Sequence, residues 1–524
     1  MDWKKQLELS PWVFGPAIVV IAVFLFFGIY VPEATGEVFD AIQGGIVDNF
    51  GWFYILSVAF FLIFVLVILF GPFGKIRLGP DDSEPEYSYL SWFAMLFSAG
   101  MGIGLVFFSV AEPIFHYTGP PFAEAETVAA ASDAMRITFF HWGFHAWAIY
   151  IVVGLSLAYF SFRKGLPLSI RSAFYPILGE RIYGPIGHLV DVLAIFGTLF
   201  GVATSLGLGV MQVNAGMDFL MDTGISTGIQ VALIAGITAV ATVSVVLGLD
   251  KGIRRLSNFN ISVAVGLVLF VFLVGPTVFI LNSWMENTGN YLQSIVETTF
   301  WLDSWGDGAW QGDWTLFYWG WWIAWSPFVG MFIARISRGR TIREFVGGVL
   351  LVPAAFTTFW LTTFGNTALQ REVVGDGGIA GLATEEMLFA LLQGFPLSVV
   401  TSILAMIVII AFFVTSSDSG SLVIDMLASG GNPDPPTAQR VFWAVLEGAV
   451  AAVLLLTGGL AALQTAAIAT GLPFAAVLVV MCFALFKALR QEREEQTRVR
   501  KVYPARKREA EVVAPPGTAP QEGD

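Results

Sequence analysis

Four tryptophans fall within seven residues of an apolar run in the segment Tyr318-Trp319-Gly320-Trp321-Trp322-Ile323-Ala324-Trp325-Ser326-Pro327. Tryptophan in membrane proteins usually lies in the interfacial belts, where its N–H group stays hydrated. Several tryptophans on neighbouring turns of one buried helix instead build an aromatic wall. At membrane depth such a wall suits an organic cation that lacks strong hydrogen-bond donors and is held over π faces.

The composition of the chain places this segment in a membrane. Hydrophobic residues make up 56% of the 524 residues and charged residues only 13%, whereas about 25% of the residues in a soluble domain are charged. Runs near the roughly 20 apolar residues that cross a bilayer recur along the chain. We expect an all-α membrane protein with twelve transmembrane helices, at about 12–30, 52–71, 89–110, 137–160, 188–217, 228–248, 258–281, 314–334, 345–368, 398–424, 439–457 and 461–487.

The charges of the connecting loops predict how these helices are oriented. Basic residues gather in alternate loops, at 75–77, 163–181, 251–255 and 335–343, whereas the loops at 33–48 and 286–313 are acidic. By the positive-inside rule the basic loops and both termini are cytoplasmic, in a multi-pass protein of the cell membrane. The net charge of −13 then comes largely from outward-facing loops. Nucleic acid is therefore not an expected partner.

The composition changes after about residue 488, so we separate a polytopic domain, 1–488, from a charged cytoplasmic tail, 489–524. The part from Gln491 to Arg508 is charged and helix-prone, and Pro515, Pro516 and Pro520 mark a disordered end. One interpretation is a solvated extension that carries topology charges. The other is a segment that binds anionic lipid headgroups and senses the state of the membrane.

Three alternating glycines interrupt the third predicted helix, in Ser98-Ala99-Gly100-Met101-Gly102-Ile103-Gly104. Glycine disfavours a helix by about 1 kcal/mol per residue, and non-helical backbone at membrane depth persists only where it lines a cavity or is buried in protein. We therefore expect a helix broken mid-membrane, whose free backbone groups face a ligand, as at the midplane of secondary transporters. The alternative is close helix–helix packing of the small-xxx-small type.

Hydroxyl residues and an aspartate cluster in the tenth predicted helix, in Thr415-Ser416-Ser417-Asp418-Ser419-Gly420-Ser421. Isolated Ser and Thr residues in membrane helices often bond back to the carbonyl four residues earlier. A cluster this dense is better explained by a hard cation such as Na⁺, which prefers oxygen ligands. Asp418 is a functional candidate because it is intramembrane, although its place near the cytoplasmic end also allows a capping or salt-bridge role.

A second aromatic set lies in the fourth predicted helix, where Trp147 and Tyr150 share a helical face and Trp142 lies on an adjoining turn. His141 and His145 have the i,i+4 spacing of metal-ligating histidines, but we find no third ligand for them. We expect them to pack or to form hydrogen bonds near the outer end. The chain's histidines do not cluster with carboxylates, and Cys482, the single cysteine, has no partner. An enzyme, with catalytic residues or a bound cofactor, is therefore not expected.

The chain resembles the betaine/choline/carnitine transporter family in several of these segments. The stretch from Trp321 to Gly330, continuing from Ala334 to Phe345, looks like that family's signature. The glycine segment, followed by Ala111-Glu112-Pro113, resembles its broken third helix, and the segments around Trp142 and Thr415 match it too. The resemblance implies a leucine-transporter-like core of two inverted five-helix repeats, helices three to seven and eight to twelve, preceded by two peripheral helices.

The resemblance also implies which residues bind a substrate and a coupling ion. The cage for a trimethylammonium group would be Trp142, Trp147, Tyr150, Trp321, Trp322 and Trp325. The carboxylate of the substrate would meet the loosened backbone at Ala99, Met101 and Gly104. Sodium would lie between the carbonyls of Ser98, Met101 and Phe412 and the hydroxyls of Thr415 and Ser416, with a second ion near Phe328, for which Thr198 and Thr204 are candidate partners.

The expected activity is Na⁺-coupled import of glycine betaine, a compatible solute used in osmoprotection. Choline-type members of the family carry aspartate where Gly104 stands, so Gly104 favours a substrate that brings its own carboxylate. Proton-coupled choline uptake and ion-independent betaine/carnitine exchange are the alternatives within the family. A channel, which needs a continuous polar path, and a sensor without transport are alternatives outside it. The resemblance also implies a homotrimer.

Overall fold

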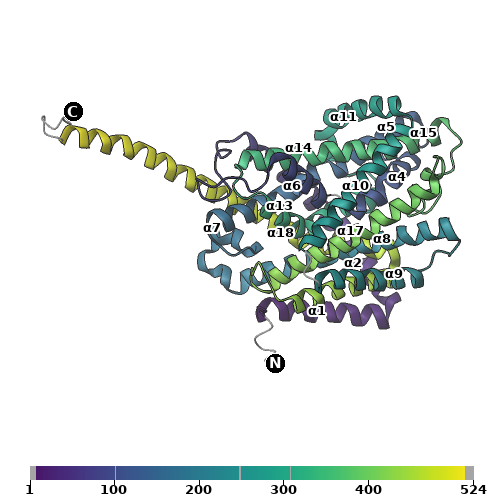
Figure 1. Ribbon diagram of the computed structural model, residues 1–524, viewed down its shortest axis with the longest axis horizontal. Helices are drawn as coiled ribbons and strands as arrows, with labels where there is room; N and C mark the ends of the chain where they lie inside the picture. Colours follow the sequence, from purple (N-terminus) through teal and green to yellow (C-terminus); the bar gives the residue numbers. More distant parts are fainter. Residues whose placement is uncertain (1–7, 101, 247–249, 307, 514–524) are drawn as a thin grey trace, which may run out of the picture.

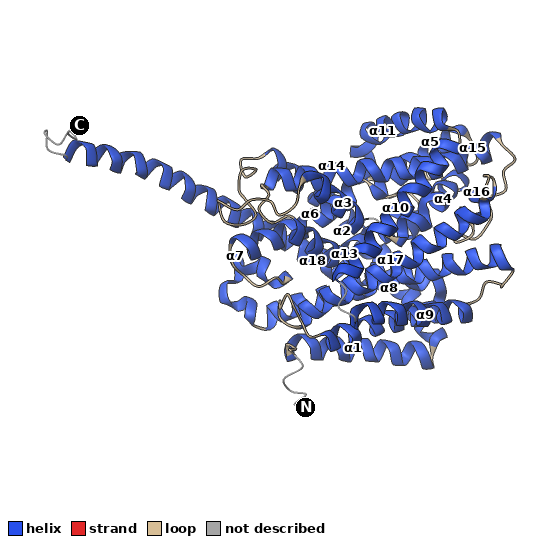
Figure 2. Ribbon diagram, in the orientation of Figure 1, coloured by secondary structure: helices blue, strands red, loops and turns tan. Residues whose placement is uncertain are grey.

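The computed structural model is a bundle of helices from which one long helix projects (Figure 1). It describes residues 8–100, 102–246, 250–306 and 308–513, and of these 97–100, 250–257 and 499–513 by their backbone alone. Within these ranges every regular element is helical (Figure 2), and the isolated β-bridge that they contain joins Arg77 to Thr341. The prediction of an all-α fold is confirmed.

The α-helices follow one another along the chain, joined by turns, loops and a few 3₁₀ or π segments. They are α1 Pro11–Tyr30, α2 Pro32–Phe70, α3 Tyr89–Gly100, α4 Ile103–Thr118, α5 Val128–Trp142, α6 Phe144–Leu157, α7 Tyr175–Leu178, α8 Pro185–Met221, α9 Thr227–Val246, α10 Asp250–Val274, α11 Thr277–Phe300, α12 Ala309–Gln311, α13 Phe317–Ile336, α14 Ile342–Leu361, α15 Thr367–Val374, α16 Met387–Gln393, α17 Ser398–Ala428 and α18 Thr437–Val513.

Eight helices of the described chain are long and apolar enough to cross a membrane, or nine if the bent pair Asn258–Val274 and Thr277–Phe300 is one span. These counts are lower than the predicted twelve. Part of the difference comes from α18, which runs through the last two predicted helices and is kinked at Gly458 and Gly459. The count of twelve and the inverted repeats stay predictions.

Two more of the predicted helices fall short for reasons that bear on the site. Helix α13 is 20 residues long, but its indole and phenol groups are only partly apolar, which lowers its hydropathy. The third predicted helix is divided, because α3 ends at Gly100 and α4 begins at Ile103 after the extended backbone of Gly102. The predicted interruption is therefore present; Met101 within it lies outside the described residues.

A second interruption was not predicted. The helix expected at 137–160 is divided at Gly143, whose backbone angles are φ −91° and ψ −136°. A Cβ atom on Gly143 would lie 2.5 Å from the carbonyl oxygen of Phe139 and 2.8 Å from the hydroxyl of Tyr291. Such contacts exclude a side chain, so the break between α5 and α6 requires glycine. It reorients the chain directly after Trp142.

Helix α13, which carries the tryptophan run, lies at the centre of the bundle (Figure 1), and every residue from Phe317 to Met331 is buried. Glycines bring its neighbours close. A Cβ atom on Gly320 would lie 2.7 Å from α18, and one on Gly330 would lie 2.5 Å from α6. From the other side, Gly197 of α8 packs against the carbonyl of Ala324. Small residues let backbones approach closely in membrane bundles. Helix α13 therefore packs tightly against α6, α8 and α18.

Candidate functional site

The tryptophans of α13 form a stack of nearly parallel rings. The centroids of Trp321 and Trp322 lie 4.6 Å apart with 17° between the ring planes. Trp325 continues the stack at 6.1 Å and 11° from Trp321, and Phe328 follows at 5.9 Å and 20° from Trp325. The helix thus presents one aromatic wall, as the sequence predicts. Trp319 takes no part in the stack and packs against Phe140 and His145.

The aromatic residues of α5 and α6 meet this wall from the side. Trp142 stands edge-on to Trp322, at 4.9 Å and 69°, and Tyr150 approaches the same ring at 6.3 Å and 72°. Trp147 packs edge-on against Tyr150 at 5.5 Å. Among the ring contacts of the described side chains, Trp147 reaches the wall only through Tyr150. The structure therefore brings all six predicted cage residues into one continuous aromatic cluster.

The cage is closed in this conformation. Its six side chains are at most 5% exposed, and the rings of Trp142 and Trp322 touch. A cation held between these faces would enter only after the rings separate.

The glycines of the broken segment lie against the edges of the wall. A Cβ atom on Gly104 would be 2.2 Å from Cη2 of Trp321, and one on Gly102 would be 2.9 Å from Cη2 of Trp325. Both positions therefore need glycine beside these rings. The backbone of Ala99 lies at the end of α3, but its side chain is outside the described residues, as is Met101.

Two indole N–H groups of the wall have no hydrogen-bond partner among the described residues, those of Trp321 and Trp325, and both are buried. The third, on Trp322, donates to the carbonyl of His141 at 2.9 Å. A buried donor without a partner costs free energy. The N–H groups of Trp321 and Trp325 are therefore available to an acceptor on a ligand. A carboxylate is one acceptor that would match them.

The residues predicted to bind sodium are only partly described. Helix α17 is continuous through its hydroxyl cluster. Thr415 donates back to the carbonyls of Ala411, at 2.9 Å, and Phe412, at 3.2 Å, so two of the predicted oxygens already share a bond. Ser416 is buried. The opposite half of the predicted site lies outside the described side chains, at Ser98, and outside the described residues, at Met101.

Of the two threonines proposed to bind a second ion near Phe328, only one has a free hydroxyl among the described contacts. Phe328 continues the tryptophan stack. Thr204 uses its hydroxyl on the carbonyls of Phe200 and Leu463, whereas the buried hydroxyl of Thr198 has no partner among the described residues. Thr198 is therefore the better candidate of the two threonines.

Asp418 lies in an ion pair, the alternative that its position allowed. Its Oδ1 atom is 2.9 Å from the guanidinium of Arg440 in α18. The adjacent Ser417 donates to the buried carboxylate of Glu447 at 3.0 Å. These contacts join α17 to α18. The pair with Arg440 accounts for the presence of Asp418 in this helix.

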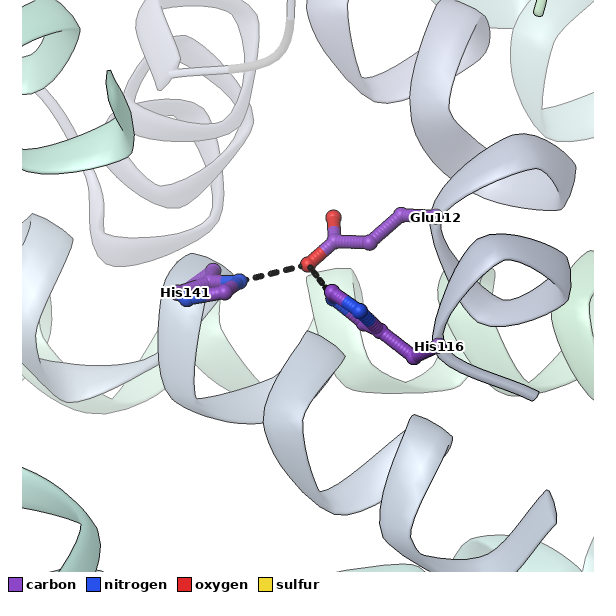
Figure 3. Close-up of side chains that lie close together, drawn as sticks. All are labelled: Glu112, His116 and His141. Carbon is purple, nitrogen blue, oxygen red and sulfur yellow. Dashed lines mark hydrogen bonds and ion pairs between the residues drawn. The ribbon is translucent and has the colours of Figure 1, made fainter. Parts of the chain in front are cut away.

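A buried cluster of Glu112, His116 and His141 was missed by sequence reasoning (Figure 3). The Oε1 atom of Glu112 lies 2.6 Å from Nδ1 of His141 and 3.3 Å from Nε2 of His116. The expectation that the histidines do not gather with carboxylates was therefore wrong. His141 turns toward α4, while His145 contacts Thr299 instead. The i,i+4 spacing of Glu112 and His116 was the available signal.

The geometry of this cluster is that of hydrogen bonds. Ligand atoms about 2.0–2.2 Å from a tetrahedral zinc ion are more than 3 Å apart, whereas Oε1 of Glu112 and Nδ1 of His141 are 2.6 Å apart. The other carboxylate oxygen, Oε2, accepts from Nε1 of Trp142 at 2.7 Å and from the hydroxyl of Tyr318 at 2.6 Å. The cluster thus reaches directly into the aromatic cage.

Comparison with known proteins shows that the chain is similar to membrane transporters. The family model described as "BCCT, betaine/carnitine/choline family transporter" matches residues 12–494. A glycine betaine transporter of Acinetobacter baylyi is 49% identical over 492 residues, 93% of this chain and 74% of that protein. The glycine betaine transporter OpuD of Bacillus subtilis is 48% identical over 493 residues, 94% of this chain and 96% of that protein. An uncharacterised transporter of Mycobacterium tuberculosis is 53% identical over 490 residues, covering 92% and 83% of the two chains.

Proposed function

Since this chain belongs to the betaine/carnitine/choline transporter family, and is a multi-pass membrane transporter rather than an enzyme, we propose that it imports glycine betaine by Na⁺ symport. Relatives that are named glycine betaine transporters support the substrate. Accumulation of this solute would serve osmoprotection.

The aromatic cage is the observation that carries the proposal. Trp321, Trp322 and Trp325 offer nearly parallel faces, and Trp142 closes them from the side. A quaternary ammonium group has no N–H group and cannot donate hydrogen bonds to acceptors. Its attraction to the site comes instead from the π faces. Each well-placed, desolvated ring contributes up to about 2 kcal/mol.

The groups beside the aromatic wall suit the negatively charged carboxylate of the substrate. No acidic side chain fits at Gly104, where even a Cβ atom would collide with Trp321. The unpaired N–H groups of Trp321 and Trp325 supply donors for a carboxylate. A zwitterion with an onium head and a carboxylate therefore fits this site better than choline does.

The proposed mechanism is alternating access in a fold of twelve helices with two inverted repeats. Sodium would bind between the hydroxyls of Thr415 and Ser416, the carbonyl of Phe412, and the carbonyls of the broken segment at Ser98 and Met101. By ordering that segment the ion would prepare the site for the substrate, so the two would bind cooperatively. The active form would be a homotrimer in the cell membrane, with both termini cytoplasmic.

Uptake of labelled glycine betaine into proteoliposomes tests the coupling. An inward sodium gradient should drive accumulation above the equilibrium level, and an equal potassium gradient should not. Equal accumulation under both gradients contradicts sodium symport. Counterflow without sodium would instead identify an exchanger, and dependence on a proton gradient would identify proton coupling.

Replacement of Trp325 by Leu tests the cage. The variant loses one stacked face but keeps an apolar side chain, so we expect a folded protein whose betaine uptake is abolished. Binding by isothermal titration and a size-exclusion profile give the readouts. Betaine affinity equal to that of the wild type would remove Trp325 from the site.

A further inference from the structure

Glu112 is a buried carboxylate that contacts Trp142 of the aromatic cage and also Tyr318, whose ring packs against Trp321 and Trp322. We propose that Glu112 is the positioning residue of the cage, which holds the rings of Trp142 and Tyr318 by their N–H and O–H groups. The inference rests on the proposed function for the meaning of the cage. It does not require sodium coupling.

The carboxylate of Glu112 has a partner for each hydrogen bond that it can accept. Oε2 accepts from Trp142 and Tyr318, and Oε1 lies within bonding distance of both His141 and His116. A carboxylate accepts up to about four hydrogen bonds. A neutral His141 with its proton on Nδ1 donates to Glu112 and leaves Nε2 to accept from Thr315, 3.0 Å away. With the proton of His116 on Nε2, each of the four neighbours supplies one donor.

These contacts connect three separate parts of the chain. Glu112 and His116 come from α4, His141 and Trp142 from the last turn of α5, and Tyr318 from the first turn of α13. Hydrogen bonds with an ionised acceptor are about twice as strong as neutral ones. The carboxylate therefore sets the distance between α5 and α13 at the point where the cage closes.

The orientation of two cage rings depends on these bonds. An indole N–H group can only donate, so the bond from Trp142 to Glu112 determines which edge of that ring faces Trp322. The ring of Trp322 is held from the same cluster, because its N–H group donates to the carbonyl of His141. Without Glu112, the N–H group of Trp142 would be buried without an acceptor, and the ring would turn to find one.

The first experiment needs no substrate and compares Glu112→Leu with the wild type by tryptophan emission. Loss of the acceptor should shift the spectrum of the ligand-free protein, and the shift should vanish when the same change is made in a Trp142→Phe background. A shift of equal size in that background overturns the proposal, since the change would then act elsewhere.

The second experiment separates positioning from general structure by measuring betaine uptake and binding. Glu112→Leu should weaken betaine affinity about tenfold, the effect of roughly 1.4 kcal/mol, with a smaller change in maximal rate. Glu112→Gln should restore most of the affinity, because its carbonyl accepts from Trp142 and Tyr318 while its amide donates to the other histidine tautomers. Unchanged affinity in Glu112→Leu, or equal losses in both variants, overturns the proposal.

Two further variants complete the design. Ser109→Ala, one turn earlier on α4, removes a buried hydroxyl that bonds only to its own helix at Val106 among the described contacts, and should leave affinity unchanged. If Glu112→Leu does not purify as a monodisperse protein, Tyr318→Phe removes one of the four donors and should weaken betaine binding about threefold; wild-type affinity would overturn the proposal. A wild type that binds no betaine, with the emission shift still dependent on Trp142, contradicts the proposed function and leaves the positioning role standing.

Discussion

The ring of Trp321 lies so close to Gly104 that no side chain fits at this position. A Cβ atom at this position would lie 2.2 Å from Cη2 of that ring, far below van der Waals contact. The neighbouring atom belongs to a ring in a stack, so it cannot yield without moving Trp322 and Trp325. A single residue thus controls the position of the whole wall.

Gly104→Ala should therefore weaken betaine binding about tenfold or more, because forcing a methyl group into a packed site costs about 1–3 kcal/mol. Isothermal titration of the purified protein measures the effect. Gly236→Ala in α9 is the matched control, since a Cβ atom there meets nothing within 4 Å. Equal affinity in the two variants would show that the wall does not bind the substrate.

At the scale of the element, α17 combines an unbroken helix with an unusual number of hydroxyls. Thr401 and Thr415 both bond back to carbonyls one turn earlier on this helix. The two threonines differ in what lies nearby, since only Thr415 belongs to the cluster with Ser416 and Asp418. The back-bond alone therefore does not distinguish a structural threonine from an ion ligand.

Thr415→Ala should raise the sodium concentration for half-maximal uptake about tenfold, because a hard cation would lose one oxygen ligand. Thr401→Ala loses the same kind of back-bond and should leave the sodium dependence unchanged. Uptake at varied Na⁺ with constant ionic strength gives the comparison. If both variants shift the sodium curve alike, the effect belongs to the helix and not to an ion site.

At the scale of the whole molecule, Arg163, the last residue of the π segment Ala158–Arg163 after α6, connects three regions of the chain. Its guanidinium donates to the carbonyl of Gly79 and to the carboxylate of Asp81, both at 2.8 Å, in the loop after α2. It also pairs with Glu492 near the projecting part of α18. Lys164 adds a second pair to Glu492 at 2.8 Å. These pairs anchor α18 to the bundle at Glu492, and the C-terminal part of this helix projects from the bundle (Figure 1).

Arg163→Met should lower the apparent melting temperature in detergent by several degrees, because the carbonyl of Gly79 loses its donor, at about 1–3 kcal/mol, and the buried Glu492 loses one of its two cationic partners. Arg490→Met is the control. Its pair with Glu494 joins side chains that are 71% and 64% exposed, and exposed pairs contribute only about 0–1 kcal/mol. Identical melting curves for Arg163→Met and the wild type would contradict the anchoring role.

Much of the fold could be predicted because it depends on local chemistry. The apolar runs predict helices, and the alternating glycines predict the break between α3 and α4. The Gly143 break escaped prediction because one of the contacts that exclude a side chain there comes from Tyr291, which is distant in sequence. The kink of α18 at Gly458 and Gly459, by contrast, lies between the two helices that the sequence predicts at 439–457 and 461–487.

The sequence by itself determined that this chain is helical, membrane-spanning and equipped with an aromatic wall on one helix, because periodicity, apolarity and residue type are local properties. Only the tertiary structure decided that Trp142 closes the wall edge-on, that Gly104 lies against Trp321, and that Glu112 binds both Trp142 and Tyr318. Contacts of this kind join residues far apart along the chain. They follow from how α4, α5 and α13 pack, which no single segment encodes.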